Sequence, residues 1–231
     1  MYFDPIYFLF VAPAMLLAMW AQFRVKSAYA QGNEIAPRSG YSGAQAAEEL
    51  LRVGGVRGVR IEQVDGFLTD HYDPTAKVLR LSPEVYTGRT LSALGIAAHE
   101  CGHAFQGAGR YPLLVVRNAL VPLASIGSGM SWLIIAVGFL MSSFGLVMLG
   151  IGAFSMTVLF QLVNLPVEYD ASRRAKLALA ETGLVTREES VYVQSVLSAA
   201  ALTYVAATLS SILTLLYFLY RSGLLGGRRE S

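Results

Sequence analysis

The stretch that decides the fold is residues 119–167, "ALVPLASIGSGMSWLIIAVGFLMSSFGLVMLGIGAFSMTVLFQLVNLPV", which contains no charged side chain. A helix needs about 20 apolar residues to cross the hydrocarbon core of a bilayer. The stretch is therefore long enough for two spans, and the small and polar residues at 142–145 predict the turn between them. We expect transmembrane helices at 119–141 and 145–166.

Two further stretches without charge, residues 5–21 and 191–220, predict transmembrane helices at 4–22 and 198–220. A cleaved signal peptide is the alternative for the first stretch, because "AYAQ" at 28–31 offers a small-x-small cleavage pattern. Signal peptides start with basic residues, however, and this chain starts "MYFDP". The sequence therefore predicts a mainly α membrane protein with about four transmembrane helices.

The composition supports a lipid bilayer as a partner. Apolar residues make up 54% of the chain and charged residues 15%, whereas soluble domains average about 25% charged. A formal charge of +2 without an arginine-rich run argues against nucleic acid. The one cysteine rules out a disulfide within the chain.

Four spans place the polar segments 23–118 and 167–197 on the same side of the membrane. Basic residues near the span ends on that side are Arg24, Lys26, Arg38, Arg110, Arg117, Arg173, Arg174 and Lys176. An excess of lysine and arginine marks the cytoplasmic face, so we expect both segments to be cytoplasmic. The opposite side has basic residues only in the tail, at Arg221, Arg228 and Arg229.

The first polar segment mixes helical and strand patterns. Ser42 and Gln45 form a capping box that opens a helix ending at Gly54. Alternating residues predict a strand in "VRIEQV" and two strands around the Asp-Pro turn of "LTDHYDPTAKVLRLS", residues 68–82. A helix then follows at 91–106, "LSALGIAAHECGHAFQ".

Two of the chain's three histidines, His99 and His103, lie four positions apart in that last helix. Residues four apart share one helix face, so the two imidazoles can bind one Zn²⁺. Glu100 can then act as a general base toward a zinc-activated water, whose pKa falls to about 7. This is the H-E-x-x-H arrangement of zinc metallopeptidases, although the pattern also occurs by chance in unrelated helices.

A catalytic zinc needs a third protein ligand, and the candidates are a carboxylate or His71. Glu168 is the first acid after the chain returns from the membrane, on the same side as His99 and His103. Asp170 is its neighbour but points to another helix face, so we favour Glu168. The alternative for Glu168 is an interfacial acid that faces water.

His71 lies in "TDHYD" on a predicted strand. It is a candidate for binding substrate or for stabilising the oxyanion, and its alternative is an ordinary surface histidine. Tyr72 and Tyr192 are other candidates for the same role.

The segments "TDHYDP", "LRLSPEVY", "AAHECGHAFQ", "PVEYDAS" and "VLSAAALTYVAA", in this order, resemble the YugP-like family of membrane-bound bacterial neutral zinc metallopeptidases. The resemblance covers nearly the whole chain. More distantly the chain is similar to the HtpX-type and prenyl-protein membrane proteases, whose second motif is E-[FY]-x-A-D. The resemblance implies a gluzincin-like zinc peptidase with His99, His103 and Glu168 as ligands and Glu100 as general base. Ser172 stands where the distant relatives have aspartate.

The same resemblance implies a small α+β zincin-like core in residues 23–118, with the H-E-x-x-H helix at 91–106 and the third ligand in 167–197. The edge strand of such a core binds extended substrate, and residues 68–82 are the candidate for it. Thr69, His71 and Tyr72 are then candidate substrate-binding residues.

The predicted function is a membrane-anchored zinc endopeptidase, multi-pass in the bacterial cell membrane, that cuts protein or peptide substrates at the cytoplasmic face. One alternative is an intramembrane protease of the site-2 type, but the nearest match to its aspartate motif is "VDG" at 64–66, upstream of the histidines. Another is a non-enzymatic membrane scaffold with a zinc site, although structural sites usually use several cysteines and this chain has only Cys101. Glycines in "SIGSGMSW" and "GLVMLGIGA" leave a homo-oligomer open.

Overall fold

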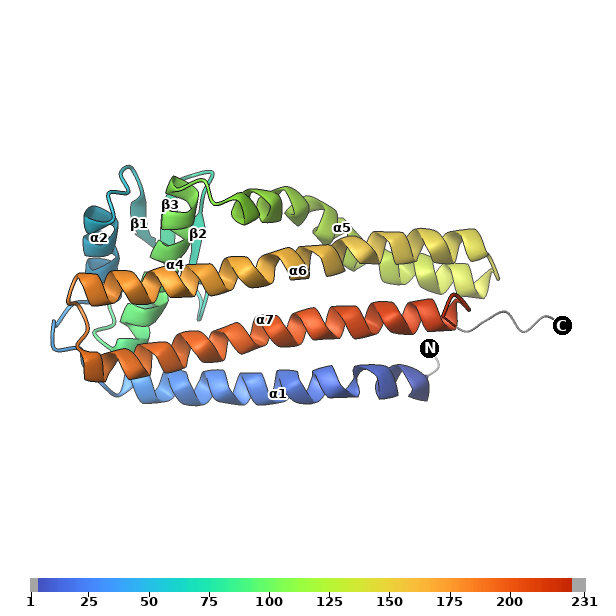
Figure 1. Cartoon of the computed structure of the whole chain (residues 1–231), viewed down its shortest axis with the longest axis horizontal. Helices are drawn as coiled ribbons and strands as arrows, with labels where there is room; N and C mark the ends of the chain where they lie inside the picture. The colour runs from blue at the N-terminus through green and yellow to red at the C-terminus, as the bar shows by residue number, and fades with distance from the viewer. Residues whose placement is uncertain (1–3, 226–231) are drawn as a thin grey trace. The chain divides into compact units, whose positions relative to one another are not determined.

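The computed structural model describes residues 4–225, which form α-helices and one small sheet (Figure 1). In chain order the elements are α1 (Pro5–Asn33), α2 (Gly43–Val53), β1 (Arg60–Gln63), β2 (His71–Asp73), β3 (Val78–Leu81), α3 (Pro83–Tyr86), α4 (Leu91–Ala108), α5 (Pro112–Leu140), α6 (Phe144–Glu181) and α7 (Arg187–Arg221).

Four of these helices, α1, α5, α6 and α7, are long and apolar enough to cross a membrane. The predicted fold class is therefore confirmed: the chain is mainly helical, with four membrane-length helices and a small three-stranded sheet. The helices extend well past the uncharged stretches. The longest, α6, has 38 residues and measures about 57 Å, against a hydrocarbon core of about 30 Å.

The chain divides into two compact units. In the described chain, the apolar unit comprises residues 4–20, 115–166 and 203–225, and the polar unit comprises residues 21–114 and 167–202. The division passes through α5 near its start and through α1, α6 and α7, each of which continues as one helix from an apolar stretch into a polar one. Pro166 does not break α6, which runs on to Glu181.

In the apolar unit, α5 and α6 approach closely at glycines. A Cβ added at Gly127 would overlap the carbonyl oxygen of Ala153, and one at Gly150 would overlap Ile135. Some of the glycines that suggested association between chains therefore serve packing within this one. Aromatic side chains fill the far end of the unit, namely Tyr7, Phe10, Trp132, Phe154, Tyr217 and Phe218.

In the polar unit, the sheet has the order β1-β3-β2, with β1 parallel and β2 antiparallel to the central β3. Leu79 and Leu81 point from β3 into the core, where they are fully buried among residues of α2 and α4. Arg80 and its cross-strand neighbour Glu62 point to the opposite, charged face. Since β3 is central, only the β2 part of residues 68–82 can be an edge, which corrects our expectation for the whole segment.

The helix α4 begins at Leu91 and runs to Ala108, past the predicted end at 106. The Thr90 hydroxyl accepts a hydrogen bond from the Ala93 amide at its start, and Gly109 terminates it. Most of α4 is buried, including Ala97, Ala98 and Cys101, because it packs against α2 and the sheet. A helix held this firmly gives its remaining polar side chains fixed directions.

Candidate metal centre

His99 and His103 project from α4 toward a single carboxylate, that of Glu168 on α6. The Nε2 atoms of His99 and His103 lie 3.2 and 3.5 Å from Oε2 of Glu168. Potential ligand atoms of all three residues lie within 4.8 Å of one another, and Glu168 is only 3% exposed. The structure thus brings together the three side chains that the sequence analysis selected as candidate metal ligands, although Glu168 lies 65 or more residues after the two histidines in the chain.

A close crossing of α4 and α6 makes this convergence possible (Figure 1). A Cβ added at Gly102 would overlap the carbonyl oxygen of Ala171, so only glycine allows the two backbones to meet there. His99 and His103 are four residues apart on one helix, and Glu168 and Ser172 are four apart on the other. Each pair shares a helix face, and the two faces meet at the crossing.

The three side chains suit a zinc ion. In tetrahedral zinc sites the metal lies about 2.0–2.1 Å from imidazole nitrogen and carboxylate oxygen, which sets neighbouring ligand atoms about 3.3 Å apart. The distances of 3.2 and 3.5 Å from Glu168 to the two histidines lie on either side of that value. Two histidines and one glutamate are also a ligand set of catalytic zinc sites, which keep a fourth position open.

The other ring nitrogen of each histidine also has a partner. The Nδ1 atom of His99 lies 3.1 Å from the Ser172 hydroxyl, and that of His103 lies 3.0 Å from Oε1 of Gln106. Such contacts orient metal-binding histidines and raise their basicity. Ser172 is therefore the partner of His99, and Gln106, the partner of His103, was missed by the sequence analysis. The available signal was its position three residues after His103 in an apolar helix.

Glu100 lies next to the group in a buried position, with 7% of its surface exposed. Within residues 4–225 its carboxylate has no hydrogen-bond or ion-pair partner, so it is uncommitted. Burial lowers the pKa of His103, but the hydrogen bond with Glu168 and the charges of Glu100 and Glu168 outweigh it, and the pKa is raised.

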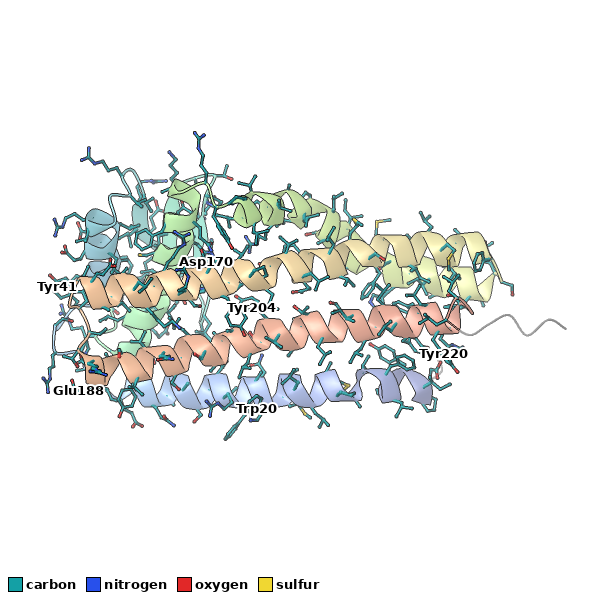
Figure 2. The ribbon with its side chains drawn as sticks, in the orientation of Figure 1. Trp20, Tyr41, Asp170, Glu188, Tyr204 and Tyr220 are labelled. Carbon is teal, nitrogen blue, oxygen red and sulfur yellow. The ribbon has the colours of Figure 1, made fainter. Side chains whose placement is uncertain are left out.

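Asp170 and Cys101 have other roles. Asp170 accepts hydrogen bonds from Gln106 at 3.0 Å, from Arg173 at 2.6 Å and from Arg174 at 2.5 Å. It does not belong to the group of candidate ligands that His99, His103 and Glu168 form. Figure 2 shows Asp170 on the C-terminal half of α6. Cys101 is fully buried beside Ala47 of α2, and burial raises the pKa of its thiol.

His71 is not brought into this group. Tyr72 packs toward Gly107 of α4, and since side chains alternate along a strand, His71 points to the opposite face of the sheet. There its Nε2 lies 3.4 Å from Arg80, and its Nδ1 lies 2.8 Å from the Thr69 carbonyl oxygen. Thr69 turns its own hydroxyl back to the carbonyl oxygens of the preceding loop.

Comparison with known proteins places the chain in a family. The family model described as "Putative neutral zinc metallopeptidase" matches residues 7–223, and the chain belongs to this family. A relative from Bacillus subtilis (strain 168), "Putative membrane protease YugP", is 45% identical over 225 residues, covering 97% of this chain and 99% of the relative. No solved structure gives a significant match. The resemblance noted from the sequence motifs is confirmed, and zinc is the metal of the family.

Proposed function

We propose that this chain is a membrane-anchored zinc endopeptidase that hydrolyses peptide bonds of protein substrates at the cytoplasmic face of the membrane. The observation that carries the proposal is the convergence of His99, His103 and Glu168 beside the uncommitted, buried carboxylate of Glu100. Membership of a zinc metallopeptidase family supports the same conclusion.

In the proposed reaction, the attacking water is activated at the zinc ion, and a side chain of the protein transfers the proton. His99, His103 and Glu168 would hold the zinc ion, which would supply Lewis-acid chemistry that makes a water molecule a usable nucleophile near neutral pH. Glu100 accepts the proton of the attacking water and delivers it to the leaving amine nitrogen. The carbon–nitrogen bond of the peptide breaks, and a carboxylic acid and an amine are released.

Substrate binds in this proposal along β2. This strand is an edge of the sheet, and Tyr72 lies against α4, the helix of His99 and His103. An extended peptide can therefore add to the edge by backbone hydrogen bonds near Thr69 and Tyr72. His71 is assigned to substrate binding at this edge rather than to the oxyanion, because it points away from α4.

The cytoplasmic orientation rests on the basic residues near the span ends, as argued from the sequence. Single cysteines at Thr87 and Ser222 test it by labelling of intact cells with a membrane-impermeant maleimide. The proposal requires labelling of Thr87→Cys only after lysis. Labelling of that variant in intact cells would place the polar unit outside.

A cut within the bilayer is disfavoured because α4 is not among the four helices apolar enough to span it. Asp65 of the "VDG" motif also lies apart from the candidate ligands.

The decisive experiment uses the full chain purified in detergent. Zinc content and cleavage of an unfolded protein are measured for wild type, Glu100→Gln and the exposed-surface control Glu48→Gln. We expect Glu100→Gln to keep its zinc and to lose about 10²–10⁴-fold in cleavage rate, the usual contribution of a general base. Full cleavage by Glu100→Gln would show that the general base is wrongly assigned, and a wild type without zinc would refute the proposed function itself.

A further inference from the structure

Gln106 of α4 is a fully buried polar residue with three side-chain contacts, two of which join α4 to α6. Its Oε1 lies 3.0 Å from Nδ1 of His103. Its Nε2 donates to the carbonyl oxygen of Val167 at 2.8 Å and to Oδ2 of Asp170 at 3.0 Å. Every polar atom of this amide therefore has a partner, as a buried amide requires.

The partners fix which way the amide points. The carbonyl oxygen of Val167 can only accept a hydrogen bond, so the NH₂ group of Gln106 must face α6. The amide oxygen then faces His103, and because that oxygen can only accept, Nδ1 of His103 must carry the proton. The neutral ring consequently has its lone pair on Nε2, the atom that faces Glu168.

His99 lacks an equivalent constraint. Its Nδ1 faces the hydroxyl of Ser172, and a hydroxyl can either donate or accept. The contact is compatible with both neutral tautomers of His99. Of the two histidines, only His103 has a partner that dictates which nitrogen is free to bind a metal.

The other end of the same amide acts on the third ligand. Val167 directly precedes Glu168, so the hydrogen bond from Gln106 holds the backbone next to that carboxylate. Asp170 is itself fixed by Arg173 and Arg174. One side chain of α4 is thus tied to the segment of α6 that carries Glu168.

We propose that Gln106 is a positioning residue of the metal centre. It holds His103 in the tautomer whose Nε2 is free for zinc, and it sets the position of Glu168 through Val167. The inference rests on the proposed function only in taking zinc as the ion. Removing an outer contact of this kind lowers metal affinity by about 10–100-fold.

The test compares two substitutions in the full chain in detergent. Gln106→Met keeps the length and apolar bulk but removes both halves of the amide. Gln106→Glu keeps an acceptor for Nδ1 of His103 and loses the donor toward Val167, while Arg173 and Arg174 beside Asp170 offset part of the added negative charge. Gln45→Met is the matched control, because Gln45 also makes side-chain amide contacts, at the start of α2 away from the metal group.

The measurements are Zn²⁺ affinity by competition with a chelator and the visible absorption of the Co²⁺-substituted protein. We expect about 10–100-fold weaker zinc binding and an altered cobalt spectrum in Gln106→Met, with less than about a tenfold loss in Gln106→Glu. Gln45→Met should bind zinc like wild type, although its unfolding temperature falls.

Two outcomes would overturn the inference. In one, Gln106→Met binds zinc with wild-type affinity and an unchanged cobalt spectrum. In the other, Gln106→Glu loses zinc as severely as Gln106→Met, or by 100-fold if Gln106→Met does not fold. Either result leaves the proposed function standing as long as wild type holds zinc and cleavage depends on Glu100. Failure of the proposed function has a different signature, which is a wild type without zinc.

Discussion

The helix α6 meets a glycine in each of the two units, and the two contacts differ in what surrounds them. In the apolar unit Gly127 of α5 lies against the carbonyl oxygen of Ala153, and in the polar unit Gly102 of α4 lies against that of Ala171. In both, a Cβ added at the glycine would overlap a carbonyl oxygen of α6. The first is surrounded by apolar side chains with Thr157 as the polar neighbour, and the second by two histidines and a carboxylate.

The comparison shows that a close approach of two helix backbones does not by itself make a metal site. A glycine brings two helix backbones within reach of each other wherever it occurs, and by itself it indicates no function. The polar unit becomes a candidate metal centre because residues four apart on both helices, His99 with His103 and Glu168 with Ser172, point into the crossing. Substitutions made in parallel at the two contacts can therefore test whether metal binding belongs to only one of them.

The largest difference in zinc binding is expected between substitutions of two buried polar residues of α6, Glu168 and Asn164. Glu168→Ala removes a zinc ligand and should weaken zinc binding by more than about 100-fold, beyond the effect of losing an outer contact. Asn164→Ala removes the acceptor of Arg117, 3.1 Å away, and should cost about 1–3 kcal/mol of stability without loss of zinc. Metal analysis and thermal unfolding of both variants check this, and a Glu168→Ala protein that retains stoichiometric zinc would contradict it.

A second pair of substitutions acts on the glycines themselves. Gly102→Ala and Gly127→Ala each force a Cβ onto a carbonyl oxygen, so both should destabilise the chain by about 1–3 kcal/mol. Only Gly102→Ala should also release zinc, because it moves α4 away from Glu168. Gly129→Ala is the control, since a Cβ there meets nothing within 4 Å. Equal zinc affinity in Gly102→Ala and Gly127→Ala would show that the close approach at Gly102 is dispensable for the metal.

A smaller effect is expected from Ser172→Ala, which removes the partner of His99 Nδ1. A hydroxyl orients an imidazole less strictly than an amide or carboxylate does, so zinc affinity should fall by about tenfold, the lower end of the range for outer contacts. Chelator competition measures it, with Ser190→Ala on α7 as a control. If Ser172→Ala loses more zinc affinity than Gln106→Met, then Ser172, and not Gln106, is the more important of the two histidine partners.

The smallest effect is expected at His71, on the charged face of the sheet. His71→Ala should leave zinc affinity unchanged and raise KM a few-fold, with little change in kcat, because the proposed role is in substrate binding. Steady-state kinetics on an unfolded protein substrate distinguish a role of His71 in substrate binding from a role in stabilising the oxyanion. A large fall in kcat at constant KM would instead support the oxyanion role.

The sequence predicted the helices and the candidate ligands for physical reasons that can be read locally. The absence of charge in residues 119–167 requires burial in lipid or protein, and the spacing of His99 and His103 guarantees a shared face on any helix. Glu168 could be chosen because the two central spans return the chain to the side from which it left. These inferences need no knowledge of how helices pack.

The contacts of Gln106 and His71 could not be predicted in this way. The partners of Gln106 lie about 60 residues further along the chain, and only the crossing of α4 and α6 determines which of its atoms meets which. The direction of His71 depends on which face of β2 is buried, and a three-residue strand with one tyrosine between two polar residues does not reveal it.

The order of the ligands along the chain has a consequence for synthesis. His99 and His103 leave the ribosome before α5 and the first part of α6, whereas Glu168 follows both. The carboxylate therefore cannot join the imidazoles until the hairpin of α5 and α6 has been made. A nascent chain that stalls before this point carries both histidines and Glu100 but lacks Glu168, so a chain incomplete in its membrane-length helices is also incomplete in its candidate metal site.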